Sequence, residues 1–208
     1  MTKNETITKF ELYMDDTSEL STTEAGALYD KIYNKVSTER PWEGTKKEAT
    51  GTLSTSIPYV SLPTRFAYMV SNSNWTRSGE YGAGPHVLVG STYRPYKVVS
   101  WSDRRQYRDA DGYAYVDFAN SRLYFTLQPA SAEAYEFDYH EFPAALAGGE
   151  SPWFPSQLHD VIYHGMCVDD FVIQQSDKAK SYKNEHEKMY TQYIDDMAYW
   201  NAQLIQTE

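Results

Sequence analysis

The sequence contains one cysteine, Cys167, among its 208 residues, which excludes an internal disulfide framework and a zinc site built from cysteines. It also contains no apolar run near the roughly 18 residues that a transmembrane helix needs. Residues 1–15 contain no apolar core of the kind found in a signal peptide, so we do not expect export by the ordinary secretory route. The length corresponds to one large domain or at most two small ones.

Basic residues are outnumbered, with 19 Lys and Arg against 29 Asp and Glu, and the net charge is -10 at pH 7. General binding to nucleic acid or to anionic membranes requires clustered positive charge, so this composition argues against both. Aliphatic residues are scarce, whereas 19 Tyr, 8 Phe and 5 Trp make the chain too aromatic for a disordered protein. Tyrosine suits surfaces that are half apolar and half wet, which are often interfaces.

The first helix predicted by the pattern begins after Ser21, because Ser21 and Glu24 have the spacing of a capping box. Pro41 ends this helix, since proline supplies no backbone donor and disfavours the helical conformation of the residue before it. Apolar residues recur at steps of three and four along the helix, with two tyrosines beside them: Ala25, Leu28, Ile32 and Val36, with Tyr29 and Tyr33.

Residues 48–143 are predicted to form strands, because short apolar or alternating runs are separated there by Gly, Pro, Asn and Asp. Residues 120–121 predict a tight hairpin and residues 109–112 a turn. In residues 135–139, aromatic side chains alternate with acidic ones, which predicts a half-buried strand. The expected strands are 50–57, 66–70, 86–89, 96–101, 113–118, 122–127 and 135–139.

Two helices are predicted near the end of the sequence, one from Pro155 to about Ile173 and one from Asp177 to Leu204. The fold class is therefore α+β: an N-terminal helix, a central antiparallel β-rich region, and two C-terminal helices. We divide the chain into 1–47, 48–143 and 144–208, with the helical parts as one body and the β region as a long insertion. The core candidates are Leu28, Ile32, Val36, Trp42, Phe137, Tyr139 and Ile162.

No residue pattern predicts a catalytic, cofactor or metal site. His159 and His164 are five positions apart on a predicted helix and therefore point about 140° apart, which does not suit two ligands of one metal. Cys167 falls on the apolar side of the same helix, where a buried and inert thiol is expected. Asp109, Asp111 and Asp117 do not fit a calcium loop, because the glycine and the final glutamate of that pattern are missing at their positions. There is no glycine-rich phosphate loop and no serine elbow.

One basic cluster, Arg104, Arg105 and Arg108, lies between two predicted strands. We expect the acidic residues among them, Asp103, Asp109 and Asp111, to neutralise it locally, which makes it a solvated loop. The second interpretation is a site that meets acidic residues of a partner.

The order of segments resembles the head-to-tail adaptor, or connector, proteins of tailed bacteriophages. A short amphipathic helix leads into residues 40–43 (Arg-Pro-Trp-Glu) and the pair Lys46-Lys47. The resemblance continues through a β region and a helical tail, in spaced positions that cover nearly the whole chain: Leu62-Pro63, Arg65-Phe66, Tyr135–Tyr139, Pro143, Leu146, Ser151-Pro152, Pro155, Leu158-His159 and the tyrosine-rich last helix.

This resemblance implies a structural virion protein without catalytic residues or cofactors, made in the host cytoplasm and located in the neck between capsid and tail. It implies a homo-oligomeric ring, expected to be a dodecamer, that lies below the portal protein and docks tail or tail-completion proteins. Double-stranded DNA would pass through the ring without specific binding, and no membrane is involved. The candidate oligomer or portal contacts are Tyr182, Tyr193, Met197, Trp200, Leu204, Tyr29 and Tyr33.

The chain departs from smaller, mostly helical adaptors by a strand-rich insert at about 71–134. This insert leaves open which surface meets the portal, and whether the protein is a later neck or tail-completion component. An alternative is a β-rich carbohydrate-binding or virion-decoration module that uses Trp75, Trp101 and Trp153 as a stacking platform. A hydrolase that uses His140 or His159 has no motif to support it.

Overall fold

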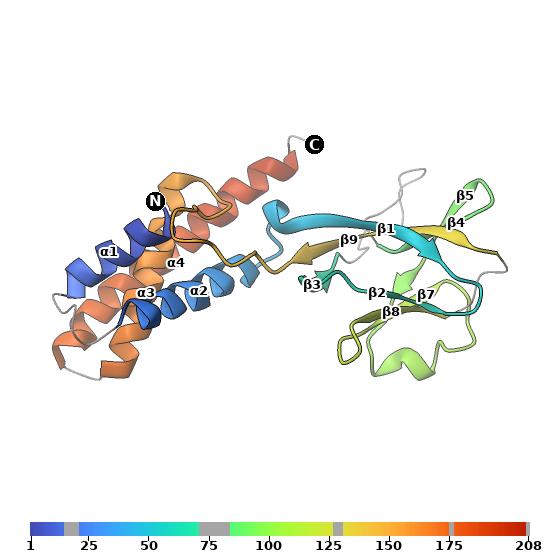
Figure 1. Cartoon of the computed structure of the whole chain (residues 1–208), viewed down its shortest axis with the longest axis horizontal. Helices are drawn as coiled ribbons and strands as arrows, with labels where there is room; N and C mark the ends of the chain where they lie inside the picture. The colour runs from blue at the N-terminus through green and yellow to red at the C-terminus, as the bar shows by residue number, and fades with distance from the viewer. Residues whose placement is uncertain (15–20, 71–83, 127–130, 175–176, 207–208) are drawn as a thin grey trace. The chain divides into compact units, whose positions relative to one another are not determined.

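The structure is a computed structural model that describes residues 1–14, 21–70, 84–126, 131–174 and 177–206 (Figure 1). The chain divides into two compact units. The helical unit comprises Met1–Thr45 together with Phe142–Glu208, and the β unit comprises Lys46–Glu141. No helix among the described residues is long and apolar enough to cross a membrane.

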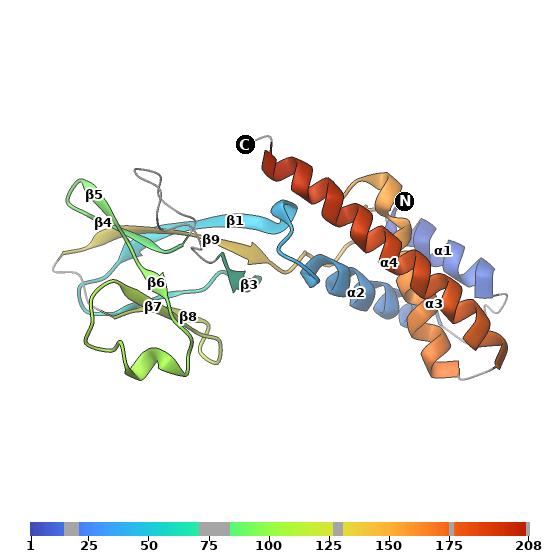
Figure 2. The same cartoon turned by 180° about the vertical axis from the view of Figure 1, so that it is seen from behind.

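The described residues of the helical unit form the helices α1 (Lys3–Met14), α2 (Thr22–Thr38), α3 (Asp160–Gln174) and α4 (Asp177–Gln206), with the short 3₁₀ turns η1 (Glu43–Thr45) and η3 (Ser156–Leu158). Helix α3 contacts each of the other three helices, as Figures 1 and 2 show from opposite sides. The core of the unit therefore forms around α3, where Val161, Ile162, Met166 and Cys167 are buried. The predicted burial of Cys167 is thus confirmed.

Helix α2 begins at the predicted cap. The Ser21 hydroxyl accepts from the Glu24 backbone N–H, and the Glu24 carboxylate accepts from the Ser21 backbone N–H at 2.8 Å, so both halves of the capping box are present. Beyond the end of the helix, the indole Nε1–H of Trp42 donates to the Val36 carbonyl at 2.7 Å. The Val36 carbonyl also accepts from the Glu39 backbone N–H at 3.4 Å, so the indole is the second and closer donor to this carbonyl in the last turn of the helix.

Helix α1 was not predicted, because its apolar pattern is short. Ile7 and Phe10 are buried with the methyl-bearing Thr6 on one side of the helix. Lys3 forms an ion pair with Asp30 of α2 at 2.7 Å. Helix α1 is thus defined mainly by its contacts with other helices, since two buried apolar side chains do not make a recognisable stripe in the sequence.

The first sheet of the β unit has five strands, and its central strand is β9 (Glu133–Glu141). Strand β1 (Lys46–Leu53) pairs with β9 over its whole length, from Lys46 opposite His140 to Leu53 opposite Glu133. The other edge of β9 pairs with β3 (Phe66–Met69) and with β4 (His86–Val89), and β4 in turn pairs with β5 (Thr92–Pro95). All these pairs are antiparallel.

The second sheet has the order β2 (Tyr59–Ser61), β8 (Arg122–Phe125), β7 (Tyr113–Asp117) and β6 (Lys97–Val98). A tight hairpin joins β7 and β8, as residues 120–121 predicted, and Ser121 adopts a positive φ of 52° there. The pairs are antiparallel except β6 with β7, which is parallel. One side of this sheet belongs to the core of the β unit, with Val60, Ala114, Leu123 and Phe125 buried.

The α+β class is confirmed, with helices at both ends and mainly antiparallel sheets between them. Several details differ from the sequence prediction. The strand expected at 50–57 lies four residues earlier, as β1, and β2 and β5 were not predicted. The strand expected at 96–101 is only Lys97–Val98, because its partner β7 pairs with it over two residues. His159 lies between η3 and α3 rather than inside the helix that contains His164.

Candidate interaction surfaces

The core candidates lie in the two cores. Ile32, Val36, Trp42 and Ile162 are buried in the helical unit and Phe137 and Tyr139 in the β unit, while Leu28 is partly buried against the helical core. Trp42 is 1% exposed and packs near Trp153, with ring centroids 6.4 Å apart.

Three of the predicted contact residues are buried inside the helical unit and not on its surface. Tyr29 and Met197 are 0% exposed, and Tyr33 is 3% exposed. The tyrosines widen the apolar stripe of α2, which faces the other helices, and Met197 lies where α4 packs on the core. Their side chains are therefore not available to a neighbouring molecule, and the contact surfaces proposed below do not include them.

The side chains of the other predicted contact residues lie along α4 and are at least partly exposed to solvent. Tyr182 is 41% exposed, whereas Tyr193, Trp200 and Leu204 are partly buried. The Trp200 ring lies 6.1 Å from that of Trp153, so part of its surface is covered within the unit. Tyr199, which was not predicted, is 71% exposed, because it lies on the opposite side of α4 from Met197.

An exposed apolar patch joins α1 and α4. Leu12 and Tyr13 at the end of α1 are 75% and 40% exposed, and the Tyr13 and Tyr182 rings meet edge to face with centroids 6.4 Å apart. We call Leu12, Tyr13 and Tyr182 the α1–α4 patch. Neighbouring exposed aromatic rings such as those of Tyr13 and Tyr182 mark interaction sites more often than isolated ones do.

Beneath this patch, His164 of α3 and His186 of α4 meet with their Nδ1 atoms 2.8 Å apart. Burial, together with the charge of a protonated His186, lowers the pKa of His164 to about 4, while Asp160 acts in the opposite direction. Burial also lowers the pKa of His186, against the influence of Glu185. The Tyr13 ring lies 4.9 Å from the imidazole of His186, so α1 covers the pair.

Sequence reasoning missed this histidine pair, although a signal for it exists. His164 lies ten residues before the end of α3 and His186 nine residues after the start of α4. In an antiparallel helical hairpin, residues at equal distances from the turn lie at the same level. The predicted buried stripe of α4 was built from apolar and aromatic residues alone. It therefore left out His186, although this side chain is buried.

The second sheet of the β unit presents a row of aromatic rings on the side away from its core. Tyr59, Tyr124 and Tyr115 are neighbours across β2, β8 and β7. The Tyr115 and Tyr124 rings stack with centroids 5.1 Å apart and 9° between their planes. Trp101, which is 45% exposed, meets the Tyr115 ring edge to face.

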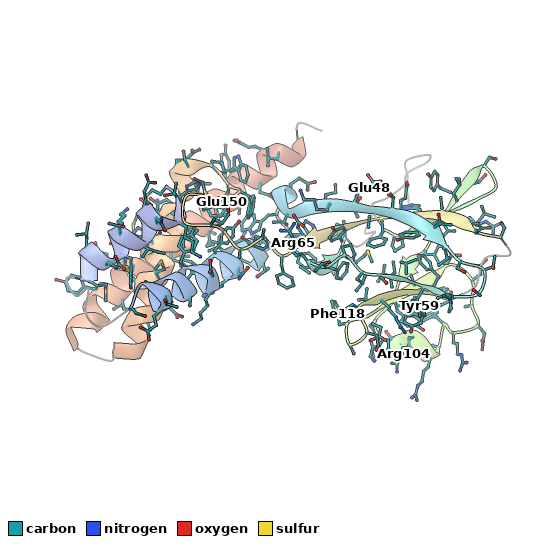
Figure 3. All side chains as sticks on the ribbon, viewed as in Figure 1. Glu48, Tyr59, Arg65, Arg104, Phe118 and Glu150 are labelled. Carbon is teal, nitrogen blue, oxygen red and sulfur yellow. The ribbon has the colours of Figure 1, made fainter. Side chains whose placement is uncertain are left out.

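Arginines flank this row. The Arg104 guanidinium lies 3.8 Å from the centre of the Trp101 ring and donates to the Trp101 carbonyl, and the Arg122 guanidinium lies 4.0 Å from the centre of the Tyr59 ring. Figure 3 labels Tyr59 and Arg104 on this side of the β unit. We call these side chains the arginine–aromatic face: Tyr59, Trp101, Arg104, Tyr115, Arg122 and Tyr124, with Arg105 and Arg108 at its rim.

A groove of about 720 Å³ runs along this face, and Arg104, Arg105 and Arg108 all line it. Burial raises the pKa of the Tyr115 phenol, while the nearby charges of Arg104 and Arg108 act to lower it. The groove is thus lined by stacked rings and by three arginines, which outnumber its one acidic residue, Asp109.

The expected neutralisation of this cluster stays a prediction, since Asp109 lines the same groove as the three arginines. The carboxylate of Asp103 accepts from the Ser100 hydroxyl at 2.7 Å, and that of Asp111 lies 4.0 Å from Arg94. In the described parts of the chain, no carboxylate lies within ion-pair distance of Arg104, Arg105 or Arg108. Side chains of adjacent residues in the turn point in different directions, which the linear sequence does not reveal.

The described residues of the two alternative functions belong to different units. Trp101 lies in the β unit and Trp153 in the helical unit, where Trp153 is partly buried and donates its indole N–H to the Ser37 hydroxyl at 3.0 Å. Trp75 lies outside the described residues. His140 stacks on Tyr68 in the β unit, and His159 bonds the Phe154 carbonyl and Met1 in the helical unit. No metal-binding group of three or more ligands exists among the described residues.

These features are those of a protein that acts through contact surfaces: two packed units, exposed aromatic patches, and arginines held on aromatic rings. Comparison with known families assigns the class more closely. The model of the family described as SU10 adaptor protein matches residues 1–207, and the chain belongs to this family of phage head-to-tail adaptors. A search of curated proteins found no match.

Membership of this family identifies the chain as a phage structural adaptor and implies a role that is not enzymatic. Its partners are accordingly phage structural proteins. The resemblance found in the sequence is therefore confirmed at the level of the family.

Proposed function

We propose that this protein forms a homo-oligomeric ring below the portal protein of a tailed phage, in the virion neck between capsid and tail. The ring extends the channel through which DNA leaves the capsid and provides the surface on which tail or tail-completion proteins dock. The observation that carries this proposal is the family match over residues 1–207, which includes both units. A dodecamer would match the rotational symmetry of the portal.

Within such a ring, we assign the helical unit to contacts with neighbouring copies and with the portal, and the β unit to the side that meets the tail. Exposed aromatic side chains on the helical unit support this assignment, because aromatic residues are enriched at interfaces. The candidates are Tyr182 and Leu12 of the α1–α4 patch, with Trp200 and Leu204 further along α4.

Negative charge suits the wall of a DNA channel. With a net charge of -10, the chain as a whole repels the phosphate backbone, so a duplex can slide without being held. We therefore expect the free protein to bind duplex DNA weakly or not at all at about 0.15 M salt.

The test uses the phage that carries this gene. A stop codon in the gene should yield heads that package DNA but do not acquire tails, and a suppressor host should restore tailed particles. In a parallel measurement, the full-length chain should co-purify with the portal protein of the same phage, and electron micrographs of the complex should show added ring density on the portal. Tailed, infectious particles without this protein would overturn the proposal.

A further inference from the structure

The charges of this chain are divided unevenly between its two units. Residues 46–141 contain ten Lys and Arg and ten Asp and Glu, so the β unit is neutral. The remaining residues contain nine basic and nineteen acidic residues, so the helical unit carries the entire net charge of -10. A positive surface on the β unit would therefore be complementary to the helical unit of another copy.

The arginine–aromatic face is such a surface. Four of the ten basic residues of the β unit lie on it or at its rim, and none of Arg104, Arg105 and Arg108 has an ion-pair partner among the described carboxylates. Arg105 and Arg108 are exposed, and both line the groove of about 720 Å³. Arg104 and Arg122 are already held against aromatic rings, so they would lose little side-chain freedom on binding.

A matching surface lies on α4. Residues at steps of three and four form one outward stripe of this helix, with a shallow hollow of about 510 Å³ along it. Glu187, Asp195 and Asp196 lie on this stripe and are exposed, so they outnumber Lys188, the basic residue that lines the same hollow. Asp195 lies 3.4 Å from Arg40. We call the three acidic residues the acidic face of α4. The stripe continues to Tyr199, which is 71% exposed.

We propose that the arginine–aromatic face of one copy binds the acidic face of α4 of a second copy. The contact is heterologous, because it joins two different surfaces, and repetition of such a contact generates a closed ring when the rotation per subunit closes. Arginine, tyrosine and tryptophan are the residues most enriched among those that dominate interface energies, and the acidic face supplies carboxylates and one exposed tyrosine to meet them. The proposal rests on the ring proposed above, and it gives the β unit a contact with the helical unit of a neighbouring copy in addition to its role on the tail side.

A duplex nucleic acid is the other occupant that arginines and aromatic rings could suit. The observations favour the second copy of the chain. The β unit has no net positive charge to attract a duplex from a distance, and the helical unit of the same chain repels it. A second copy of the chain offers an acidic surface to the arginines and a basic surface to α4, whereas a duplex offers negative charge alone.

The experiment measures self-association of the full-length chain by sedimentation equilibrium, from about 5 μM to about 1 mM, at low and high salt. The wild type should self-associate, and high salt should weaken the association because it screens the charges. The variant R105E/R108E should associate at least tenfold more weakly, and so should E187K/D196K. A mixture of these two variants should regain association, since each wild-type face then finds a wild-type partner and each reversed face a reversed one.

The matched control is R94E/K97E, which changes the charge of the β unit by the same amount through two exposed residues that do not line the groove. It should associate like the wild type. Circular dichroism and thermal unfolding should show that all variants are folded.

Several outcomes would overturn the inference. These are a wild type that remains monomeric up to about 1 mM at low salt, an unchanged R105E/R108E, or a mixture that does not recover. Tight binding of a 30-base-pair duplex at about 0.15 M salt that R105E/R108E abolishes would assign the face to nucleic acid instead. Each of these leaves the co-purification with portal and the tail-attachment phenotype unaffected, so failure of this inference is distinguishable from failure of the proposed function.

Discussion

His164 of α3 and His186 of α4 share one hydrogen bond between their Nδ1 atoms, at 2.8 Å, beneath the exposed Tyr13 of α1. One Nδ1 must carry a proton and donate, and the other must accept, so the pair tolerates two neutral imidazoles and disfavours two charged ones. Their burial lowers the pKa of both. The contact between α3 and α4 is consequently sensitive to pH.

The sign of this dependence follows from the lowered pKa values. Near pH 6.5 the unfolded chain binds protons that the folded chain, with the pKa of His164 at about 4, does not bind. The histidine pair therefore contributes its full stability above about pH 6.5 and loses it as the pH falls towards 4, by roughly 2–3 kcal/mol in total. Urea unfolding at a series of pH values should show this decrease.

Carboxylates also titrate in acid and change the stability there. The variant H164Q distinguishes the contribution of the histidine pair from theirs. Above pH 7, its free energy of unfolding should differ from that of the wild type by a constant amount. Between pH 6.5 and 4, the wild type should lose more stability than the variant. Parallel curves for the two proteins over that interval would contradict this prediction.

Trp42→Ala should destabilise the helical unit by about 3–5 kcal/mol, because the substitution leaves a large cavity and removes the bond from the indole to the Val36 carbonyl. Trp200→Ala should cost less, since this side chain is only partly buried. Chemical unfolding measures both. Trp42→Phe keeps most of the apolar volume and should lie between the wild type and Trp42→Ala, whereas equal stability of the wild type and Trp42→Ala would place Trp42 on the surface.

Gly165→Ala should destabilise the contact between α2 and α3, although alanine is the better helix former. A Cβ at position 165 would lie 2.5 Å from the Ile32 Cγ2 atom, so the two helices could not keep their present distance. The expected cost is about 1–3 kcal/mol, measured by thermal or urea unfolding. Gly26→Ala in α2 is the matched control, because a Cβ there meets no atom within 4 Å, and it should be neutral or stabilising by up to about 1 kcal/mol. In the background of Ile32→Ala, the cost of Gly165→Ala should shrink.

Ser21→Ala should destabilise α2 by about 1 kcal/mol, since it removes the hydroxyl that caps the Glu24 backbone N–H. Ser21→Asp should retain most of the stability, because a carboxylate also caps a helix start and interacts favourably with its dipole. Ser56→Ala, an exposed serine in the β unit, serves as the control and should change stability little. Equal unfolding midpoints for Ser21→Ala and Ser56→Ala would show that the cap contributes nothing.

The elements that could be predicted are those whose signals are local. The capping box at Ser21, the 3-4 spacing of α2, the strict alternation of residues 135–139 and the hairpin at residues 120–121 each follow from the geometry of one helix or one pair of strands. Helix α1 and strand β5 carry weaker patterns, because few of their side chains are buried.

The interaction surfaces were less accessible to prediction. Tyr29 and Tyr33 looked suited to subunit contacts because tyrosine is common at interfaces, yet both complete the core of the helical unit. Conversely, Tyr199 was passed over because it lies off the apolar stripe, and that position is what exposes it. Burial of a side chain on a helix depends on which neighbours pack against it, and the neighbours come from distant parts of the chain.

The sequence by itself determined the acidic and aromatic character of this protein, its α+β order, and its resemblance to head-to-tail adaptors. Only the tertiary structure decided that Arg122 lies on the Tyr59 ring, that the helical unit carries the net charge, and that His164 meets His186. Composition and spacing are properties of neighbouring residues along the chain. Contacts between residues 22 or more positions apart form only when helices or strands pack against each other. That packing depends on side chains from both elements becoming buried at the same time.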